Sequence, residues 1–248
     1  MGTGIHTISE PSTATRLGKL HWLLSIQSLV VVLVSINRLS SLTLGYVATN
    51  EFLRWVDFHN MLTLPLVSLV SFYLVKKQLE QNAPSRQGRR QMYLNLAFII
   101  GIYLLGASYG NHEVTNYLHV RFCPDGGSSP LCSIVIFNDD EFSHWLFFTG
   151  FVFVNAALML MQVLFPYPLR TSGGDRALLV LNGLFIGAGI FANLAFEAIG
   201  LDLFVVALLA FLALGLLWRR GAQPLLVYYS SAYSLGLIAT ALYKGLVG

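Results

Sequence analysis

The sequence predicts an all-α membrane protein, a bundle of seven transmembrane helices. The chain of 248 residues is 55% hydrophobic and only 11% charged, whereas soluble domains carry about 25% charged residues. Its apolar residues occur in runs of roughly 20, which is the helix length that crosses a bilayer core of about 30 Å. No polar stretch is long enough to fold as a separate soluble domain, so residues 1–248 are expected to form a single transmembrane domain.

The expected spans follow one another with short polar connections. The polar N-terminus is too long before its first apolar run to be an ordinary cleaved signal peptide, and we expect a short tail that leads into an uncleaved helix. Pro65 lies inside the second span, and Pro166 and Pro168 end the fourth. The seven spans are expected at residues 21–37, 56–75, 92–110, 142–165, 176–198, 201–218 and 224–246.

The fifth span contains Gly183 and Gly187, which are four residues apart. Two small residues at this spacing let a neighbouring helix approach closely. We interpret the pair as a packing surface within the bundle and not as a dimer face.

The distribution of Lys and Arg predicts the orientation of the bundle, because cytoplasmic loops carry an excess of these residues. With the N-terminus inside, 11 of the 15 basic residues fall in inner segments and 4 in outer ones. The N-terminus is therefore predicted to be cytoplasmic and the C-terminus external. The inner residues are Arg16, Lys19, Lys76, Lys77, Arg86, Arg89, Arg90, Arg170, Arg176, Arg219 and Arg220, and the outer ones are Arg38, Arg54, Arg121 and Lys244.

The reactive side chains are concentrated between Ser108 and His144, where the third and fourth spans are joined. Ionisable residues clustered where membrane helices meet water indicate a functional site, here on the extracytoplasmic side. The stretch contains three of the six histidines, both cysteines and five acids: His112, His119, His144, Cys123, Cys132, Glu113, Asp125, Asp139, Asp140 and Glu141.

Cys123 and Cys132 are nine residues apart in a turn-rich segment, FCPDGGSSPLC. An oxidising outer face would let them pair, so the prediction is a disulfide, with two free thiols as the alternative. The chain has no CxxC motif, which argues against thiol–disulfide catalysis.

Helical spacing gathers the polar residues into two stripes, because residues at i, i+4, i+7 and i+11 share a helix face. In the third span, residues at this spacing form one stripe if the helix continues past the membrane surface: Ser108, His112, Thr115 and His119. In the fourth span, His144 follows Asp140 by four residues and Glu141 by three, and Asn155 continues that face inward.

The two stripes are expected to face each other at one membrane depth. His59 begins the second span and Glu197 ends the fifth span at that depth. The predicted pocket is therefore formed by Ser108, His59, His112, Glu113, His119, Asp140, Glu141, His144, Asn155 and Glu197.

This set of side chains predicts a divalent-metal site. Imidazole and carboxylate ligands suit Zn or Fe, and an open coordination position could activate water. The predicted ligands are His112, His119, Asp140 and His144, with Glu141 or Glu113 as the general base. The Glu-x-x-His motif occurs once, at Glu141–His144, which argues against a di-iron centre built from two such motifs.

A structural interpretation of the same residues stays open, in which they are polar groups that cap helices and bond one another at a wet interface. Asn138, Asp139 and Asp140 are suitable N-caps for the fourth span. For Asp139 taken alone, the cap is favoured over a ligand. For His59 taken alone, an interface histidine satisfied by its neighbours is favoured.

Two short motifs resemble those of known families. Asp140-x-x-x-His144 followed by Trp145 resembles the hallmark of VanZ-like membrane proteins, and the resemblance implies a site within the membrane. Ser108-x-x-x-His112 together with Asp140 is similar to the first two parts of the motif of alkaline ceramidase and adiponectin-receptor hydrolases. The last span has no histidine for the third part of that motif, so the zinc site of that family is not carried over whole.

Two classes of function follow from these observations. The first is a membrane enzyme that hydrolyses or oxidises a lipid or lipid-linked substrate at the outer face. The second is a non-catalytic transporter, receptor or structural subunit that uses the same cluster to bind a proton, a ligand or a partner. No basic patch with interleaved aromatics is present, so nucleic acid is not expected as a partner.

The predicted orientation can be tested with reporter fusions. A reporter placed after Arg90 should be cytoplasmic, because basic residues keep the loop before the third span on that side. A reporter placed at Gly127, beyond the third span, should be external. Alkaline phosphatase and green fluorescent protein fusions measure the two locations. If both fusions report the same side, the prediction of the third span is wrong.

Overall fold

The computed structural model describes residues 13–82, 88–124, 126, 129–168, 171–196 and 200–247. In these residues the regular structure is helical, apart from one isolated β-bridge between Tyr46 and Arg54. Seven helical segments of the described chain are long and apolar enough to cross a membrane. The predicted fold class is therefore confirmed, whereas the orientation of the bundle in the membrane stays a prediction.

The helices follow one another along the chain in the order that the spans predict. They are α1 (Thr13–Leu39), α2 (Trp55–Phe58), α3 (Leu64–Glu80), α4 (Arg89–Phe122), α5 (Pro130–Ile136), α6 (Ser143–Leu164), α7 (Gly173–Phe196), α8 (Leu201–Arg220) and α9 (Pro224–Val247). Two short π-helical turns, η1 (His59–Thr63) and η2 (Phe137–Phe142), join α2 to α3 and α5 to α6 into continuous rods.

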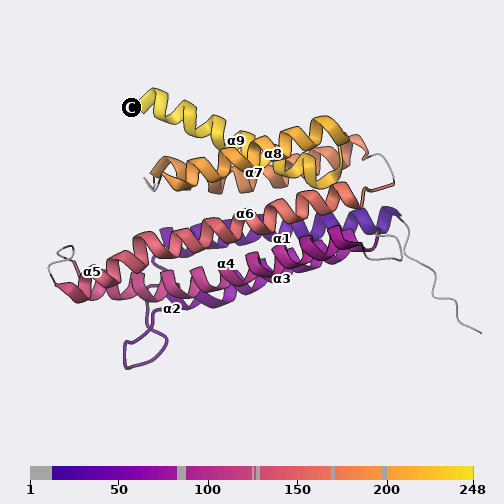
Figure 1. Ribbon diagram of the computed structural model, residues 1–248. Helices are drawn as coiled ribbons and strands as arrows, with labels where there is room; N and C mark the ends of the chain where they lie inside the picture. The colour runs from indigo at the N-terminus through magenta and orange to yellow at the C-terminus, as the bar shows by residue number, and fades with distance from the viewer. Residues whose placement is uncertain are drawn as a thin grey trace, which may run out of the picture.

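The helices form two groups that lie side by side (Figure 1). One group contains α1, α3, α4 and α6, and the other contains α7, α8 and α9. The most extensive packing is between α7 and α9 and between α4 and α6, while contacts of α1 with α7 and of α6 with α8 join the groups. The connection between α4 and α5 lies at one end of the first group. We call this end of the group the hairpin end.

The third and fourth spans extend further toward the hairpin end than the sequence predicted. At 34 residues, α4 is about 51 Å long, which exceeds the bilayer core of about 30 Å. The fourth span begins at Pro130, not near residue 142. It begins there because the Ser129 hydroxyl accepts a hydrogen bond from the Cys132 amide at 3.2 Å, and proline occupies the first turn.

This early start overturns the prediction that Asn138, Asp139 or Asp140 caps a helix. The chain passes through these residues in the π-helical turn η2, and α6 continues from it with no side-chain cap. All three residues therefore lie within a continuous rod. The connection that joins the two spans contracts to residues 123–129.

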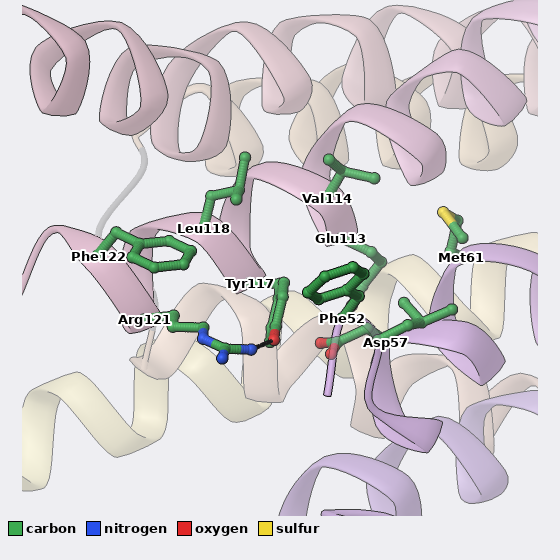
Figure 2. Close-up of a pocket in the computed structure, with 10 residues that line it drawn as sticks. Phe52, Asp57, Met61, Glu113, Val114, Tyr117, Leu118, Arg121 and Phe122 are labelled. Carbon is green, nitrogen blue, oxygen red and sulfur yellow. Dashed lines mark hydrogen bonds between the residues drawn. The ribbon is translucent and has the colours of Figure 1, made fainter. Parts of the chain in front are cut away.

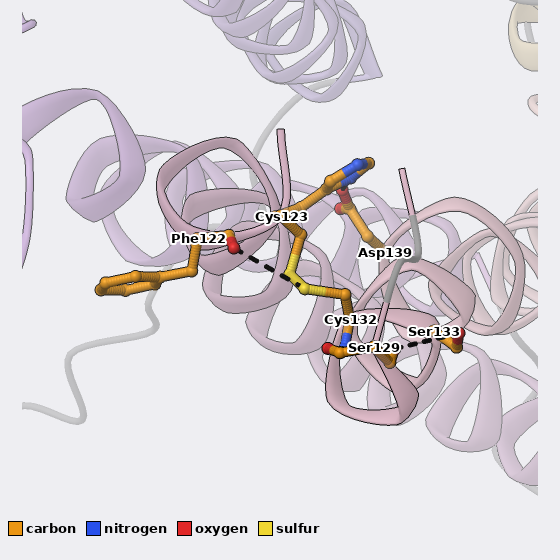
Figure 3. Close-up of a disulfide and its surroundings, with 7 residues drawn as sticks. Phe122, Cys123, Ser129, Cys132, Ser133 and Asp139 are labelled. Carbon is orange, nitrogen blue, oxygen red and sulfur yellow. Dashed lines mark hydrogen bonds and ion pairs between the residues drawn. A yellow bond between two sulfur atoms is a disulfide. The ribbon is translucent and has the colours of Figure 1, made fainter. Parts of the chain in front are cut away.

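The predicted disulfide closes the hairpin end. Cys123 and Cys132 are bonded, with their Cα atoms 5.5 Å apart (Figure 3), a usual separation for a disulfide. Both cysteines are buried. The bond holds Cys123, the first residue after α4, against the first turn of α5, so the two rods keep one relative position.

Glycines allow α4 and α6 to pack with their backbones in near contact. A methyl group on Gly150 of α6 would lie 2.8 Å from the carbonyl oxygen of Gly101 of α4. In α7, Gly183 and Gly187 are equally close to the backbone of α9, which confirms their interpretation as packing within the bundle. The close α4–α6 approach determines how the polar residues of the two rods meet.

This packing leads to a matched pair of variants. Gly150→Ala should destabilise the bundle by about 1–3 kcal/mol, because neither backbone can move away from the added methyl. Gly106→Ala is the control, since a methyl there would lie 4.0 Å from Leu69 Cδ1 and should stabilise the helix by up to about 1 kcal/mol. Unfolding by SDS titration, followed by circular dichroism, compares the two. Equal midpoints would contradict the close approach.

Candidate functional site

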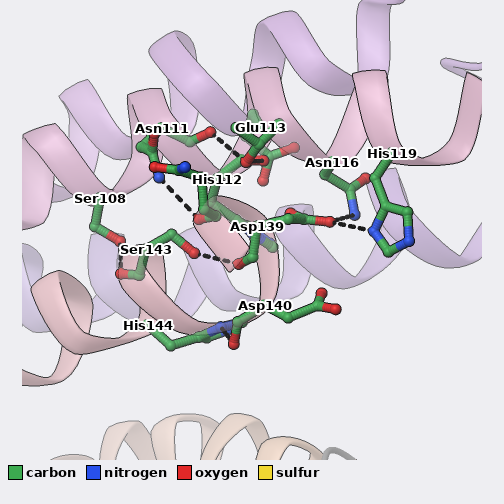
Figure 4. Close-up of polar contacts among 12 residues, drawn as sticks. Ser108, Asn111, His112, Glu113, Asn116, His119, Asp139, Asp140, Ser143 and His144 are labelled. Atoms are coloured by element: carbon green, nitrogen blue, oxygen red, sulfur yellow. Dashed lines mark hydrogen bonds and ion pairs between the residues drawn. The ribbon is translucent and has the colours of Figure 1, made fainter. Parts of the chain in front are cut away.

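The site is organised around the carboxylate of Asp139, which is 1% exposed. Its Oδ1 lies 3.0 Å from Nδ1 of His112, and its Oδ2 lies 2.9 Å from Nδ1 of His119 (Figure 4). The amide of Asn116 donates to the same Oδ2 at 3.4 Å. The two histidines are seven residues apart on α4, so their rings reach the carboxylate from opposite sides. We call Asp139, His112, His119 and Asn116 the Asp139 cluster.

The π-helical turn η2 places Asp139 toward α4. A π turn contains more residues than an α turn, so it rotates the residues that follow it about the helix axis. Asp139 and Ser143 are consequently buried, while Asp140 is exposed. The four-residue spacing of Asp140 and His144 predicted Asp140 as the residue that faces α4. That prediction used α-helical geometry throughout the span.

Polar side chains of α4 satisfy the backbone around this turn. Asn111 donates its amide to the carbonyl oxygen of Asn138 at 2.8 Å, and the Ser108 hydroxyl donates to the carbonyl oxygen of Ser143 at 2.8 Å. The Ser143 hydroxyl in turn donates to the carbonyl oxygen of Asp139. These bonds hold η2 against α4, so the predicted pocket residue Ser108 positions the site through the backbone.

The hydrogen-bond partners indicate which imidazole nitrogen carries the proton. Nδ1 of His112 lies 3.0 Å from Oδ1 of Asp139 without the geometry of a hydrogen bond. An ionised carboxylate can only accept, so Nδ1 of His119 carries the hydrogen that faces Oδ2 of Asp139. His144 has the same arrangement, with its Nδ1 2.7 Å from the carbonyl oxygen of Asp140. The Nε2 lone pair of His119 and that of His144 are then available to a ligand, as in metal sites where a carboxylate orients the ligating histidine.

The structure brings together part of the predicted metal set. Ligand atoms of His119, Asp139 and Asp140 all lie within 4.8 Å of one another. His119 and Asp140 were predicted as ligands, and Asp139 was not. The rings of His112 and His144 lie beside each other, with centroids 5.2 Å apart, so His144 adjoins the cluster through His112.

Glu113, predicted as a general base, lies on another face of α4. It is 4% exposed, and its Oε1 accepts a hydrogen bond from Arg38 at 2.8 Å. Glu141 is exposed in η2, directly after Asp140.

The remaining pocket residues lie apart from the Asp139 cluster. His59 stacks on the Trp55 ring at 5.6 Å, and its Nδ1 lies 3.3 Å from the Thr63 hydroxyl. Asn155 lies 11 residues after His144, about 16 Å along α6, and donates to its own helix at the Phe151 carbonyl. Glu197 lies outside the described residues.

Sequence reasoning missed Asp139, Asn111 and Asn116. A local signal for Asp139 was present in Ser129 and Pro130, a good N-cap followed by a good first-turn residue. A helix that begins there continues through Asp139 and excludes it as a cap. The π turn that rotates it inward has no comparable local signal.

The chain matches no protein-family model, no curated protein and no solved structure. The likenesses of Asp140-x-x-x-His144 and Ser108-x-x-x-His112 to known motifs therefore stay predictions.

The central place of Asp139 can be tested by stability alone. Asp139→Asn should cost about 1–3 kcal/mol, because it removes the negative charge that lies against two imidazoles and places an amide nitrogen against one of them. Asp140→Asn, one residue away and exposed, should change stability by less than about 0.5 kcal/mol. Unfolding midpoints measured in a metal-chelating buffer compare the two. An Asp139→Asn protein as stable as Asp140→Asn would contradict the arrangement.

Proposed function

We propose that the protein is an integral membrane enzyme that binds a divalent metal, Zn or Fe, at the Asp139 cluster and acts on a lipid or lipid-linked substrate. The observation that carries the proposal is the group formed by His119, Asp139 and Asp140, whose ligand atoms lie within 4.8 Å of one another. Burying a carboxylate such as that of Asp139 is costly unless it is paired or coordinates a metal.

The donor set fits such a metal. Zinc binds imidazole nitrogen and carboxylate oxygen at about 2.0–2.2 Å, so ligand atoms on one ion are at most about 4.4 Å apart. The ligand atoms of His119, Asp139 and Asp140 lie within 4.8 Å of one another, so a small movement of the exposed Asp140 would complete the site. When bound, the metal would supply Lewis acidity and lower the pKa of a water molecule.

The protein residues would take three roles in this enzyme. Asp139 would bind the ion together with His119 and would hold His112 beside them. Asp140 supplies negative charge to the cation. Glu141 is the better candidate for the general base, because Glu113 is ion-paired with Arg38 on another face of α4.

The surroundings of the cluster favour a lipid substrate. Exposed aromatic side chains lie on both sides of Asp139 along the same rod: the Phe137 ring contacts those of Phe142 and Trp145, with centroids 6.4 and 5.7 Å away. Aromatic residues, tryptophan above all, are enriched at the depth of lipid headgroups. A headgroup at this depth would lie beside the cluster while its chains stay in the bilayer.

The alternative is a transporter, receptor or structural subunit. A buried aspartate with histidine neighbours can exchange a proton, and such residues form proton relays in membrane carriers. This alternative requires no metal, so metal content separates the two proposals.

The metal proposal predicts the effect of single histidine substitutions. His119→Ala and His112→Ala should each remove stoichiometric metal and lipid-directed activity while the bundle stays folded. His21→Ala is the control, because His21 pairs with Asp175 about 25 Å along α1 from Arg38, and His6→Ala is a second one. Elemental analysis of the purified proteins, with a lipid-turnover assay, measures both effects. Full metal content and activity in both variants would overturn the enzyme and favour the transporter or structural role.

A further inference from the structure

A cleft of about 320 Å³ opens on another face of α4, between this helix and the segment that leads into η1 (Figure 2). It is lined by Phe52, Leu53, Asp57, Met61, Glu113, Val114, Tyr117, Leu118, Arg121 and Phe122. No residue of the Asp139 cluster is among them. Its volume lies within the range of small-molecule sites, about 300–1,000 Å³.

One wall of the cleft is apolar and open to the surroundings. Val114, Leu118 and Phe122 form this wall on α4, and Phe52 and Met61 face it from the other side. Val114 remains 48% exposed. An acyl chain placed along this wall would cover apolar surface that the protein does not cover itself.

The carboxylates at the base of the cleft are already neutralised. Asp57 is 2% exposed and accepts two hydrogen bonds from Arg54, at 2.7 and 2.8 Å. The Asp57 carboxylate raises the pKa of the Arg54 guanidinium above its ordinary value. Glu113 is paired with Arg38 at 2.8 Å. The base of the cleft therefore does not require a cation.

Arg121 differs from these arginines because neutral groups hold it. Its guanidinium donates to the Tyr117 hydroxyl and to the carbonyl oxygen of Glu51, and it faces the rings of Tyr117 and Phe122 at 5.6 and 5.4 Å. Within the described residues, no carboxylate lies within ion-pair distance of it. Among the residues that the structure describes, the guanidinium of Arg121 therefore has no carboxylate partner at the mouth of an apolar cleft.

The position of Arg121 along α4 matches the depth of lipid phosphates. It lies 32 residues (121 minus 89) after Arg89 at the other end of the helix, about 48 Å along the axis. A typical tilt of about 20° reduces this to about 45 Å, close to the thickness of a bilayer with its headgroups. The apolar wall then lies on the hydrocarbon side of the guanidinium.

We infer that this cleft binds one anionic phospholipid from the bilayer, with an acyl chain along Val114, Leu118 and Phe122 and the phosphate at Arg121. Arginine forms paired hydrogen bonds with phosphate oxygens, and the net charge of the headgroup compensates that of the guanidinium. The site is independent of the proposed enzyme, because it uses a different face of α4.

Titration of the purified full-length protein with short-chain lipids, followed by native mass spectrometry, tests this site. Dioctanoyl phosphatidylglycerol should bind at least tenfold more tightly than dioctanoyl phosphatidylcholine. Arg121→Gln should reduce phosphatidylglycerol binding to the phosphatidylcholine level. Val114→Trp should block both lipids by filling the cleft, whereas Val120→Trp, on the same helix, 59% exposed and outside the cleft, should block neither.

Each arm can overturn the inference. Equal binding of the two lipids by the unchanged protein, or unchanged phosphatidylglycerol binding by Arg121→Gln, would contradict the contact between the phosphate and Arg121. Unchanged binding by Val114→Trp would contradict lipid binding in the cleft, even if Arg121→Gln failed to fold. Glycerol phosphate that bound as tightly as the lipid would show that a free anion, not a lipid, is the ligand. Loss of metal in His112→Ala should leave lipid binding unchanged, which separates failure here from failure of the enzyme proposal.

Discussion

The hairpin end of the bundle depends on the contact between the Asp139 carboxylate and the two histidines of α4. A charge this deeply buried costs several kcal/mol unless its partners compensate it, and both carboxylate oxygens face an imidazole Nδ1. The contact is possible because η2 rotates Asp139 toward α4 and because Gly101 and Gly150 bring the two rods together. The disulfide then holds the rods at their common end. Fold and site are therefore coupled through one pair of helices.

Helix α4 presents two faces of different character at this end. On one face, Asp139 is paired with histidines and Asp140 is exposed beside them, an arrangement suited to a cation. On the other face, Glu113 and Asp57 are paired with arginines, and Arg121 has no carboxylate partner within the described part of the chain, an arrangement suited to an anion. In both places the buried charges are paired within the protein. The charged side chain beside them, Asp140 on one face and Arg121 on the other, remains exposed. A π-helical turn borders each face, as is common at functional sites.

The fold was predictable because its signals are local. Run lengths of apolar residues predicted the seven spans, and the spacing of Cys123 and Cys132 predicted their pairing. The glycine spacing in α7 predicted a helix contact inside the bundle. His112 and His119 both lie against Asp139, because they share one face of a helix that continues that far.

The sequence by itself thus determined the helical class, the number of spans and the region that holds the polar site. Only the tertiary structure decided which carboxylate lies at the centre and which partner each acid takes. Asp139 and Asp140 are neighbours with similar chemistry, and the geometry of the π turn that contains both decides which of the two is buried. Glu113 pairs with Arg38, 75 residues away in the chain, and no local spacing encodes such a contact. Partner choice follows from how packed helices are rotated about their axes, and that rotation is a property of the whole bundle.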